Sequence, residues 1–148
     1  MQPSEIIIQT GYELMDVDKI HAFLHHHSTW AKGIPFQTVE RALQHSLCFG
    51  AFCSSTHVQT GFCRLITDYA TFANLVDVIV WPQFRGQGIA SQLMDAVACH
   101  PDLQGLRRIT LATSDAHGLY AKHGFTPLSK PDTFMERYVP DIYQQHAL

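Results

Sequence analysis

The stretch from Asp77 to Ala90 constrains this chain most, because it joins a strand pattern to a helical pattern through two glycines. It begins as an apolar run, turns at Trp81-Pro82 and enters a helical pattern from Ile89 to Ala98. The first N–H groups of a helix have no intrahelical partners, and the positive end of the helix dipole lies there. Gly86 and Gly88 carry no Cβ, so an anion can approach the backbone closely. The stretch therefore predicts a phosphate site.

Two common nucleotide motifs do not fit this stretch. The dinucleotide fingerprint G-x-G-x-x-G requires a third glycine where this chain has Ser91. The P-loop requires a lysine after its second glycine, and here Ile89 follows Gly88. A glycine turn that only joins a strand to a helix is the alternative to a phosphate site.

Length and composition predict one domain spanning residues 1–148, with a loose tail from Asp141 to Leu148. Apolar residues make up 46% of the chain, which excludes disorder as the default. The net charge of −3 argues against a nucleic-acid partner and is compatible with a cationic substrate such as an amine. No apolar run reaches the ~18 residues of a membrane span, and no signal peptide is evident, so no membrane partner is expected.

Cysteine and histidine usage predicts no metal site. The four cysteines lack C-x-x-C spacing and indicate reduced, partly buried thiols of a cytoplasmic protein, with a catalytic cysteine as the alternative. His21 and His25 have the i, i+4 spacing that suits a metal on a helix, but no third ligand with sensible spacing follows. A polar helix face is the favoured interpretation.

Apolar periodicity predicts an α/β (α+β) chain with the element order β-α-α-β-β-β-α-β-α-β-β. The expected strands are Glu5–Gln9, Leu47–Cys53, Val58–Thr67, Phe72–Trp81, Arg108–Thr113, a run from Phe125, and Phe134–Val139. The expected helices begin at Asp16 or Asp18, at Phe36, after Gly88 and at Asp115. Two short turns between three consecutive strands indicate an antiparallel meander.

Two motifs resemble the GNAT superfamily of N-acetyltransferases. Arg85-Gly86-Gln87-Gly88-Ile89-Ala90 resembles its pyrophosphate signature, Gln/Arg-x-x-Gly-x-Gly/Ala. Leu119 to Phe125 resembles its Leu-Tyr-x-x-x-Gly-Phe motif. The element order is also the one GNAT domains show, so the resemblance covers most of the chain and implies a mixed, mostly antiparallel central sheet with splayed strands. More loosely, Arg64–Asp68, Ala112–Gly118 and Phe134–Glu136 resemble a group of uncharacterised bacterial members.

The resemblance implies an enzyme that moves an acetyl group from acetyl-coenzyme A directly to a primary amine in a ternary complex, without a metal. The expected acceptor is a small molecule or an amino-acid-like amine. A protein lysine or N-terminus stays open as the acceptor, and a catalytically silent acyl-coenzyme A sensor is the alternative of another class. A homodimer also stays open.

The same resemblance implies which residues bind coenzyme A. The pyrophosphate would lie on the N–H groups from Arg85 to Ala90, that is, on Arg85, Gly86, Gln87, Gly88, Ile89 and Ala90. The pantetheine arm would pair with the backbone of Val78, Ile79 and Val80, where GNAT sheets splay open through a bulge. A backbone N–H near Ile79 would polarise the thioester carbonyl. Thr113 stands where many members have an asparagine that contacts the pantetheine, although Thr113 and Ser114 still offer hydroxyls.

Three side chains are candidates for proton transfer. An amine with a pKa of about 10 is protonated at pH 7 and must lose its proton before it attacks. Asp77, the one charged residue from Leu75 to Val80, is the first candidate base, because burial would raise its pKa. His117 is the second candidate. Tyr120 stands where the family commonly has the tyrosine that protonates the leaving thiolate. For each, a packing, capping or positioning role is the alternative.

The acceptor side is expected among the N-terminal helices, their loop and the strand turns. Trp30, Phe36, Tyr69 and Phe72 are the aromatic candidates there, and Asp68 is a candidate for holding a cationic group. Core or lid packing is the alternative for each of them.

Overall fold

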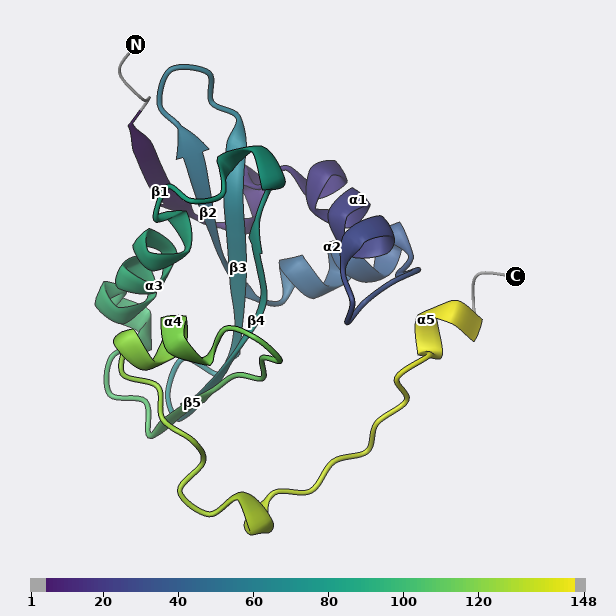
Figure 1. Cartoon of the computed structure of the whole chain (residues 1–148), viewed down its shortest axis with the longest axis vertical. Helices are drawn as coiled ribbons and strands as arrows, with labels where there is room; N and C mark the ends of the chain where they lie inside the picture. Colours follow the sequence, from purple (N-terminus) through teal and green to yellow (C-terminus); the bar gives the residue numbers. More distant parts are fainter. Residues whose placement is uncertain (1–4, 146–148) are drawn as a thin grey trace.

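The central feature of the computed structural model, which describes residues 5–145, is one five-stranded sheet with helices on both faces (Figure 1). In spatial order the strands are β1 (Ile6–Thr10), β2 (Leu47–Cys53), β3 (Gln59–Thr67), β4 (Phe72–Val80) and β5 (Arg108–Thr110). The first four strands are antiparallel neighbours, and β5 runs parallel to β4. The predicted mixed, mostly antiparallel sheet and its meander are therefore confirmed.

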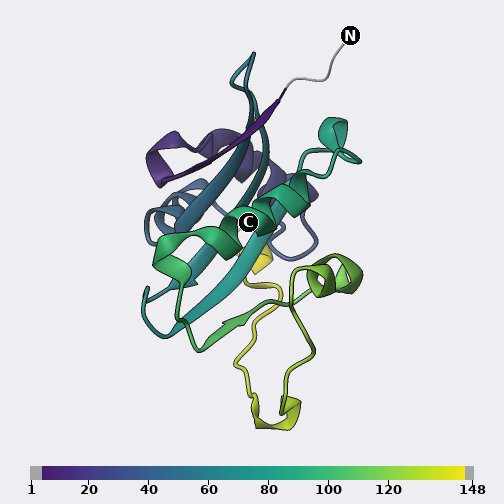
Figure 2. The same cartoon turned by 90° about the vertical axis from the view of Figure 1, so that its left-hand side faces the viewer.

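The helices divide between the two faces of the sheet, as the two views show (Figures 1 and 2). The elements are α1 (Val17–His27), α2 (Phe36–Gln44), α3 (Ile89–Cys99), α4 (His117–Lys122) and α5 (Ile142–Gln145). Helices α1 and α2 cover one face, and α3 and α4 cover the other. Short 3-10 turns span Tyr12–Leu14, Pro82–Phe84, Pro101–Leu103 and Pro131–Thr133.

Local sequence explains where α1 and α3 begin. The Asp16 carboxylate accepts a hydrogen bond from the Lys19 N–H at 3.1 Å, so Asp16 rather than Asp18 caps α1. Gly88 precedes α3 in the left-handed conformation with φ of 77°, which glycine adopts without strain. No side chain caps α3, so its first N–H groups stay available.

Each face of the sheet has its own apolar core. Ile20, Leu24, Val39, Leu43, Phe62 and Ile79 are among the residues buried under α1 and α2. Phe49, Cys63, Leu65, Leu75, Ile89, Leu93 and Tyr120 are among those buried under α3 and α4. Gly61 lets α3 lie close to β3, because a Cβ at this position would come within 2.8 Å of Ile89 Cγ2.

A β-bulge interrupts β4 at Asp77. In the pairing with β3, Phe62 lies opposite Ile79 while Arg64 lies opposite Val76, so β4 carries an extra residue. Asp77 has a φ of 56°, which is uncommon for a residue other than glycine. The extra residue exchanges the faces to which alternate side chains point. The bulge expected from the family resemblance is therefore present, and Asp77 lies at it.

β4 and β5 separate two residues before Asp77. They pair only where Phe72–Asn74 lies beside Arg108–Thr110. From Leu75 onward β4 has β3 on one side and no strand on the other, within the described residues. The splayed strands that the resemblance implied are thus seen as an open edge on β4.

The C-terminal part differs from the expected order. The strands expected from Phe125 and over Phe134–Val139 are absent, and residues 126–140 (here called the arm) pair with no strand in the described chain. Strand propensity alone does not make a strand, because its hydrogen bonds need a neighbouring strand. β5 also ends at Thr110 rather than Thr113, and α4 begins at His117 rather than Asp115.

The arm leaves α4, passes β5 and returns to α5 (Figure 1). Tyr143 of α5 packs against the apolar core under α1 and α2. In the tail that was expected to be loose, the structure places this short helix, and residues 146–148 lie outside the described part of the chain.

Candidate active site

The loop between β4 and α3 forms an open cradle. Gly86 and Gly88 have φ of 80° and 77°, and a Cβ built on either would meet nothing within 4 Å. Within residues 5–145, the N–H groups of residues 86–91 find no backbone carbonyl acceptor, and the first bond back to the loop runs from Gln92 N–H to Gly88 O. Free N–H groups at a helix N-terminus suit a phosphate, so this loop fits a pyrophosphate.

The cradle opens beside the free edge of β4. The Trp81 N–H donates to Thr60 O on β3 at 3.1 Å, so by alternation the Ile79 N–H also faces β3. The backbone groups of Val78 and Val80 then face the open edge. Consistent with this, the Val80 carbonyl accepts a hydrogen bond from Arg85 Nε at 3.0 Å. The Arg85 side chain thus links the cradle to the end of this edge through a hydrogen bond.

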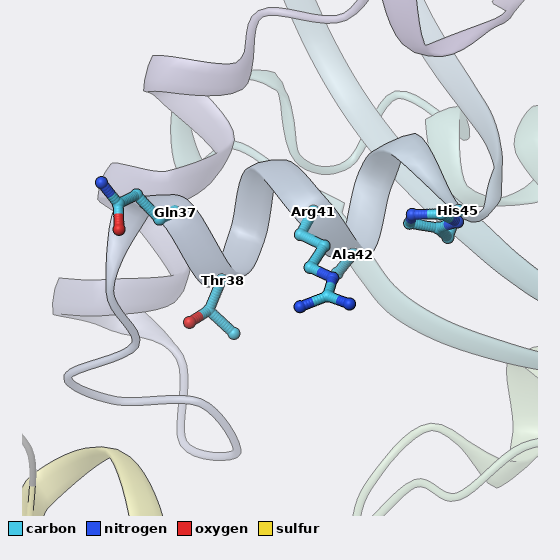
Figure 3. A pocket seen from close by; sticks show the side chains of 5 residues that line it. All are labelled: Gln37, Thr38, Arg41, Ala42 and His45. Atoms are coloured by element: carbon cyan, nitrogen blue, oxygen red, sulfur yellow. The ribbon is translucent and has the colours of Figure 1, made fainter.

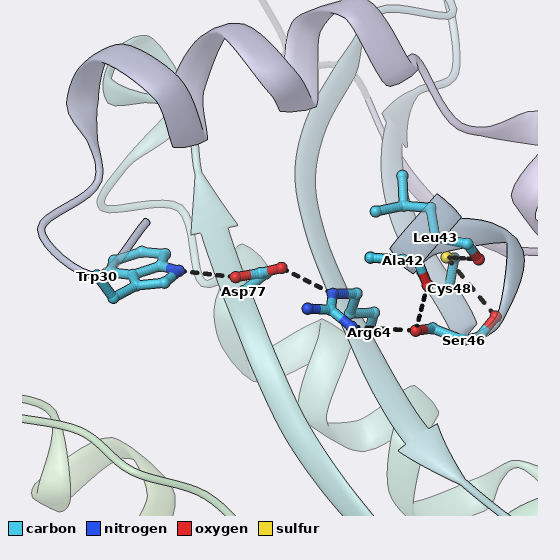
Figure 4. Close-up of polar contacts among 7 residues, drawn as sticks. All are labelled: Trp30, Ala42, Leu43, Ser46, Cys48, Arg64 and Asp77. Atoms are coloured by element: carbon cyan, nitrogen blue, oxygen red, sulfur yellow. Dashed lines mark hydrogen bonds and ion pairs between the residues drawn. The ribbon is translucent and has the colours of Figure 1, made fainter. Parts of the chain in front are cut away.

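Asp77 is the centre of a polar chain on the α1–α2 face of the sheet (Figure 4). Its Oδ1 accepts from Trp30 Nε1 and its Oδ2 from Arg64 Nε, each at 2.7 Å. Arg64 Nη1 donates to Ser46 Oγ at 3.1 Å, and Ser46 Oγ donates to the Ala42 carbonyl of α2 at 2.7 Å. Asp77 is only 7% exposed, whereas Trp30 is 47% exposed. Both carboxylate oxygens of the first candidate base therefore already hold a partner, although each oxygen keeps a further acceptor position.

Tyr120 lies on the opposite face of the sheet, in the apolar core under α3 and α4. It is 8% exposed and meets the Phe125 ring edge-on at a centroid distance of 6.0 Å. Burial raises the pKa of the Tyr120 hydroxyl, and the neighbouring Cys63 and Asp115 act in the same direction. The phenol therefore stays protonated throughout the neutral range. Asp77 and Tyr120 therefore lie on opposite faces of the sheet.

The remaining candidates around α4 differ in exposure. His117 is exposed and is the first residue of α4. The Thr113 hydroxyl accepts a hydrogen bond from the Ala116 N–H at 3.1 Å, so Thr113 stabilises the turn into α4. Ser114 beside it is exposed.

The acceptor candidates fall into two places. Trp30 and Phe36 lie on the α1–α2 side, where the Phe36 ring contacts His21 edge-on at 5.4 Å. Tyr69 and Phe72 lie in or beside the β3–β4 turn, about 16 Å of strand away from Asp77. The fold therefore does not bring Tyr69 and Phe72 close to Asp77.

Asp68 organises that turn. Its carboxylate accepts from the N–H groups of Ala70, Thr71 and Phe72 and from the Thr71 hydroxyl. The Thr71 bonds are the largest cause that holds the pKa of Asp68 well below its usual range. These hydrogen bonds show that the carboxylate of Asp68 stabilises the turn.

A groove along α2 contributes residues that sequence reasoning missed. It has a volume of about 630 Å³ and is lined by Gln37, Thr38, Arg41, Ala42 and His45 (Figure 3). Ser46, which directly follows His45, contacts Arg64 of the Asp77 chain. The available signal was the i, i+4 spacing of Arg41 and His45, which places two basic side chains on one face of the helix.

The surroundings of the cysteine thiols and of two histidines indicate a structural role. Burial is the main cause that raises the pKa of Cys48 to about 12, and burial also raises the pKa of Cys63. Ring nitrogens of His21 and His25 each lie 3.0 Å from the Ile34 carbonyl. Among residues 5–145, no three His, Cys, Asp or Glu side chains are grouped as metal ligands. The helices of that part of the chain are also too short or too polar to cross a membrane.

Comparisons with known proteins agree with this geometry. Residues 44–127 match the sequence model described as Acetyltransferase (GNAT) domain. A curated relative, named as a candidate acetyltransferase of Gibberella zeae, is 30% identical over 139 residues, which cover 80% of this chain and 77% of the relative.

Two solved acetyltransferase structures are also similar to this chain. A candidate acetyltransferase of the GNAT family from Xanthomonas campestris pv. campestris is 54% identical, with a TM-score of 0.91 over 96% of this chain and 99% of that chain. A GNAT family acetyltransferase from Streptococcus pneumoniae TIGR4 is 25% identical, with a TM-score of 0.68 over 91% of this chain and 98% of that chain.

The chain therefore belongs to the GNAT family of acetyltransferases. It is an acyl-coenzyme A-dependent acetyltransferase, and its fold is one that uses acetyl-coenzyme A.

Proposed function

We propose that this chain is a cytoplasmic N-acetyltransferase that acetylates the primary amine of a small, amino-acid-like acceptor by direct transfer in a ternary complex. The observation that carries the proposal is the open edge of β4, which has Asp77 at its bulge and ends at the glycine cradle, while Tyr120 lies on the opposite face of the sheet from Asp77. Donor, base and acid would meet at this edge.

The chain offers two backbone features to the donor. The free N–H groups of residues 86–91 would hold the pyrophosphate, and the backbone of Val78 to Val80 would pair with the pantetheine arm as an added strand. When bound, acetyl-coenzyme A supplies an activated thioester carbonyl. The bulge at Asp77 supports this placement, because it turns the Val78 N–H toward the open edge.

Different side chains would carry the two proton transfers, from the ammonium group and to the departing sulfur. Asp77 Oδ1 or Oδ2 would accept the ammonium proton directly or through water, with Arg64 and Trp30 holding the carboxylate in place. Tyr120 would hold a proton at its hydroxyl for the departing sulfur, because burial keeps the phenol neutral. His117 is the second candidate base, and its exposure at the start of α4 favours exchange with solvent.

The groove along α2 supports the acceptor class. Arg41 and His45 line it, and Arg64 connects it to Asp77 through Ser46. A guanidinium suits bidentate recognition of a carboxylate. We infer that the groove holds the carboxylate of the acceptor while its amine reaches the bulge.

An amine panel tests the function. Purified protein is mixed with acetyl-coenzyme A and either amino acids or the corresponding amines without the carboxylate, and free thiol is followed. Release that depends on the amino acid, and whose KM rises at least about tenfold in Arg41→Ala, supports the proposal. Donor binding without amine-dependent release supports the sensor instead, and release with peptides alone supports a protein acceptor.

A further inference from the structure

Ser91, His123 and Asp95 form a row of side chains beside the glycine cradle. His123 Nε2 lies 3.3 Å from Ser91 Oγ, and His123 Nδ1 lies 3.5 Å from Asp95 Oδ1. Ser91 and Asp95 stand one turn apart on α3, whereas His123 directly follows α4. His123 belongs to the Leu119–Phe125 motif, so this contact joins the second family motif to the helix that follows the first.

The Ser91 hydroxyl is placed to reach the cradle. Ser91 is the third residue of α3, and helical side chains tilt toward the N-terminus of their helix, which here adjoins the open loop. Its own N–H is one of those without a backbone acceptor within residues 5–145. A hydroxyl can accept one hydrogen bond while it donates another. Ser91 can therefore accept from His123 and donate into the cradle at the same time.

Asp95 determines which nitrogen of the neutral His123 ring carries the proton. A carboxylate accepts hydrogen bonds and cannot donate one, so Asp95 favours an N–H at Nδ1. In the neutral ring Nε2 then has a lone pair and accepts the Ser91 proton, which leaves oxygen lone pairs toward the cradle. In the imidazolium Nε2 carries an N–H, so Ser91 accepts from it and its own proton is free for a phosphate oxygen.

The surroundings of the imidazole allow its charge to change. The His123 side chain is 15% exposed, so a proton can reach it from solvent. Asp95 faces the ring from α3, and Lys122 adjoins it on α4 with an exposed side chain. Histidine is the side chain that changes its charge between about pH 5 and 8. A pyrophosphate in the cradle would add a second anion near the ring and so favour the imidazolium.

We propose that His123 makes phosphate binding at the cradle proton-linked, because its imidazole takes up a proton from solvent when the pyrophosphate of coenzyme A binds, and Ser91 then donates to a phosphate oxygen. The inference rests on the donor site proposed above. His123 acts through Ser91 and is a positioning residue. Affinity for the donor therefore falls as pH rises, since the neutral ring withdraws the Ser91 proton from the phosphate.

Dephospho-coenzyme A is the probe that tests this linkage. It keeps the pyrophosphate and lacks the phosphomonoester, whose own second proton titrates near pH of about 6. Calorimetry in two buffers of different ionisation enthalpy measures the protons taken up on binding. In the wild-type protein we expect proton uptake near neutral pH and an affinity that falls about tenfold from about pH 6 to about pH 8.5.

Three variants identify the group that takes up the proton. His123→Gln keeps a polar side chain that cannot change its charge, so its binding should show neither proton uptake nor the fall in affinity with pH. Ser91→Ala should also lose the uptake and should bind about tenfold more weakly than wild type at about pH 6. His26 is an exposed histidine of α1, on the other face of the sheet. His26→Gln is therefore the matched control and should bind as wild type does.

Gly88→Glu separates this inference from the donor site on which it rests. If Gly88→Glu binds dephospho-coenzyme A as tightly as wild type, the donor site is misplaced and the inference fails with it. If Gly88→Glu loses binding but wild type takes up no proton, or His123→Gln takes up as much as wild type, the donor site stands and the linkage is overturned. The wild-type measurement needs no variant, so it decides the question even where a variant fails to fold.

Discussion

Arg64 Nε lies 2.7 Å from Asp77 Oδ2, joining β3 to β4 at the bulge. The side chains of both residues are largely buried, with 14% of Arg64 and 6% of Asp77 exposed. A buried charge pair contributes little net stability, but removing one partner leaves the other charge without compensation. The pair therefore holds the bulge in one arrangement, within the open edge of β4.

Comparing Asp77→Asn with Arg64→Met distinguishes two roles for Asp77. The carboxylate either accepts the proton of the amine or only positions its neighbours. Asparagine tolerates positive φ and still accepts from Trp30, so the bulge should persist with a free energy of unfolding lower by about 2 kcal/mol. If Asp77 is the base, kcat falls about 100-fold in Asp77→Asn and less than about tenfold in Arg64→Met. Steady-state kinetics across pH measure this. Equal losses in the two variants, with an unchanged pH profile, contradict the role of Asp77 as a base.

Tyr120→Phe keeps the ring that packs against Phe125 and removes the hydroxyl alone. We expect kcat to fall at least about tenfold with little change in Tm, because the apolar contacts remain. Unaltered kcat in a correctly folded variant would remove Tyr120 from the reaction.

The raised pKa of Tyr120 also predicts how stability depends on pH. Above the unfolded value of about 10, the unfolded chain loses the phenolic proton while the folded chain keeps it, so stability falls as pH rises. Absorbance titration of wild type minus Tyr120→Phe should show a phenol that ionises above the normal range. Ionisation at the normal value contradicts its burial.

Gly88→Glu tests the cradle. It places a side chain and a negative charge among the free N–H groups, so coenzyme A affinity should fall at least about tenfold by calorimetry. Gly105→Glu is the matched control, because Gly105 has the same φ of 77° and equally open space, but lies between Leu103 and β5. Equal affinity in the two variants shows that the phosphate site is elsewhere.

Gly61→Ala tests the contact between α3 and β3. A Cβ would lie 2.8 Å from Ile89 Cγ2 and 3.2 Å from the Ile79 carbonyl oxygen, so overpacking should cost about 1–3 kcal/mol in urea unfolding. Gly118→Ala in α4 meets nothing within 4 Å and should change stability by no more than about 1 kcal/mol. An unchanged Gly61→Ala would mean that α3 shifts freely on the sheet.

Much of the fold and the open glycine loop before α3 followed from the sequence because their signals are local. Two short turns between three consecutive strand runs predicted the meander, and the glycines after Pro82 predicted the cradle. The groove that we propose for the acceptor was harder to predict from the sequence. The groove along α2 depends on which helix face stays uncovered, and Asp68 proved to organise a turn whose hydrogen bonds only the folded chain displays.

By itself, the sequence determined the family motifs, the order of the first nine elements and the glycine cradle, since each depends on residues close together in the chain. Only the tertiary structure decided that Trp30, Arg64 and Asp77 meet, because their contact requires the bulge and the packing of a loop on the sheet. It also decided the state of Phe134–Val139. A strand pattern becomes a strand only when another strand supplies its hydrogen bonds, and this chain offers that segment no such neighbour within residues 5–145.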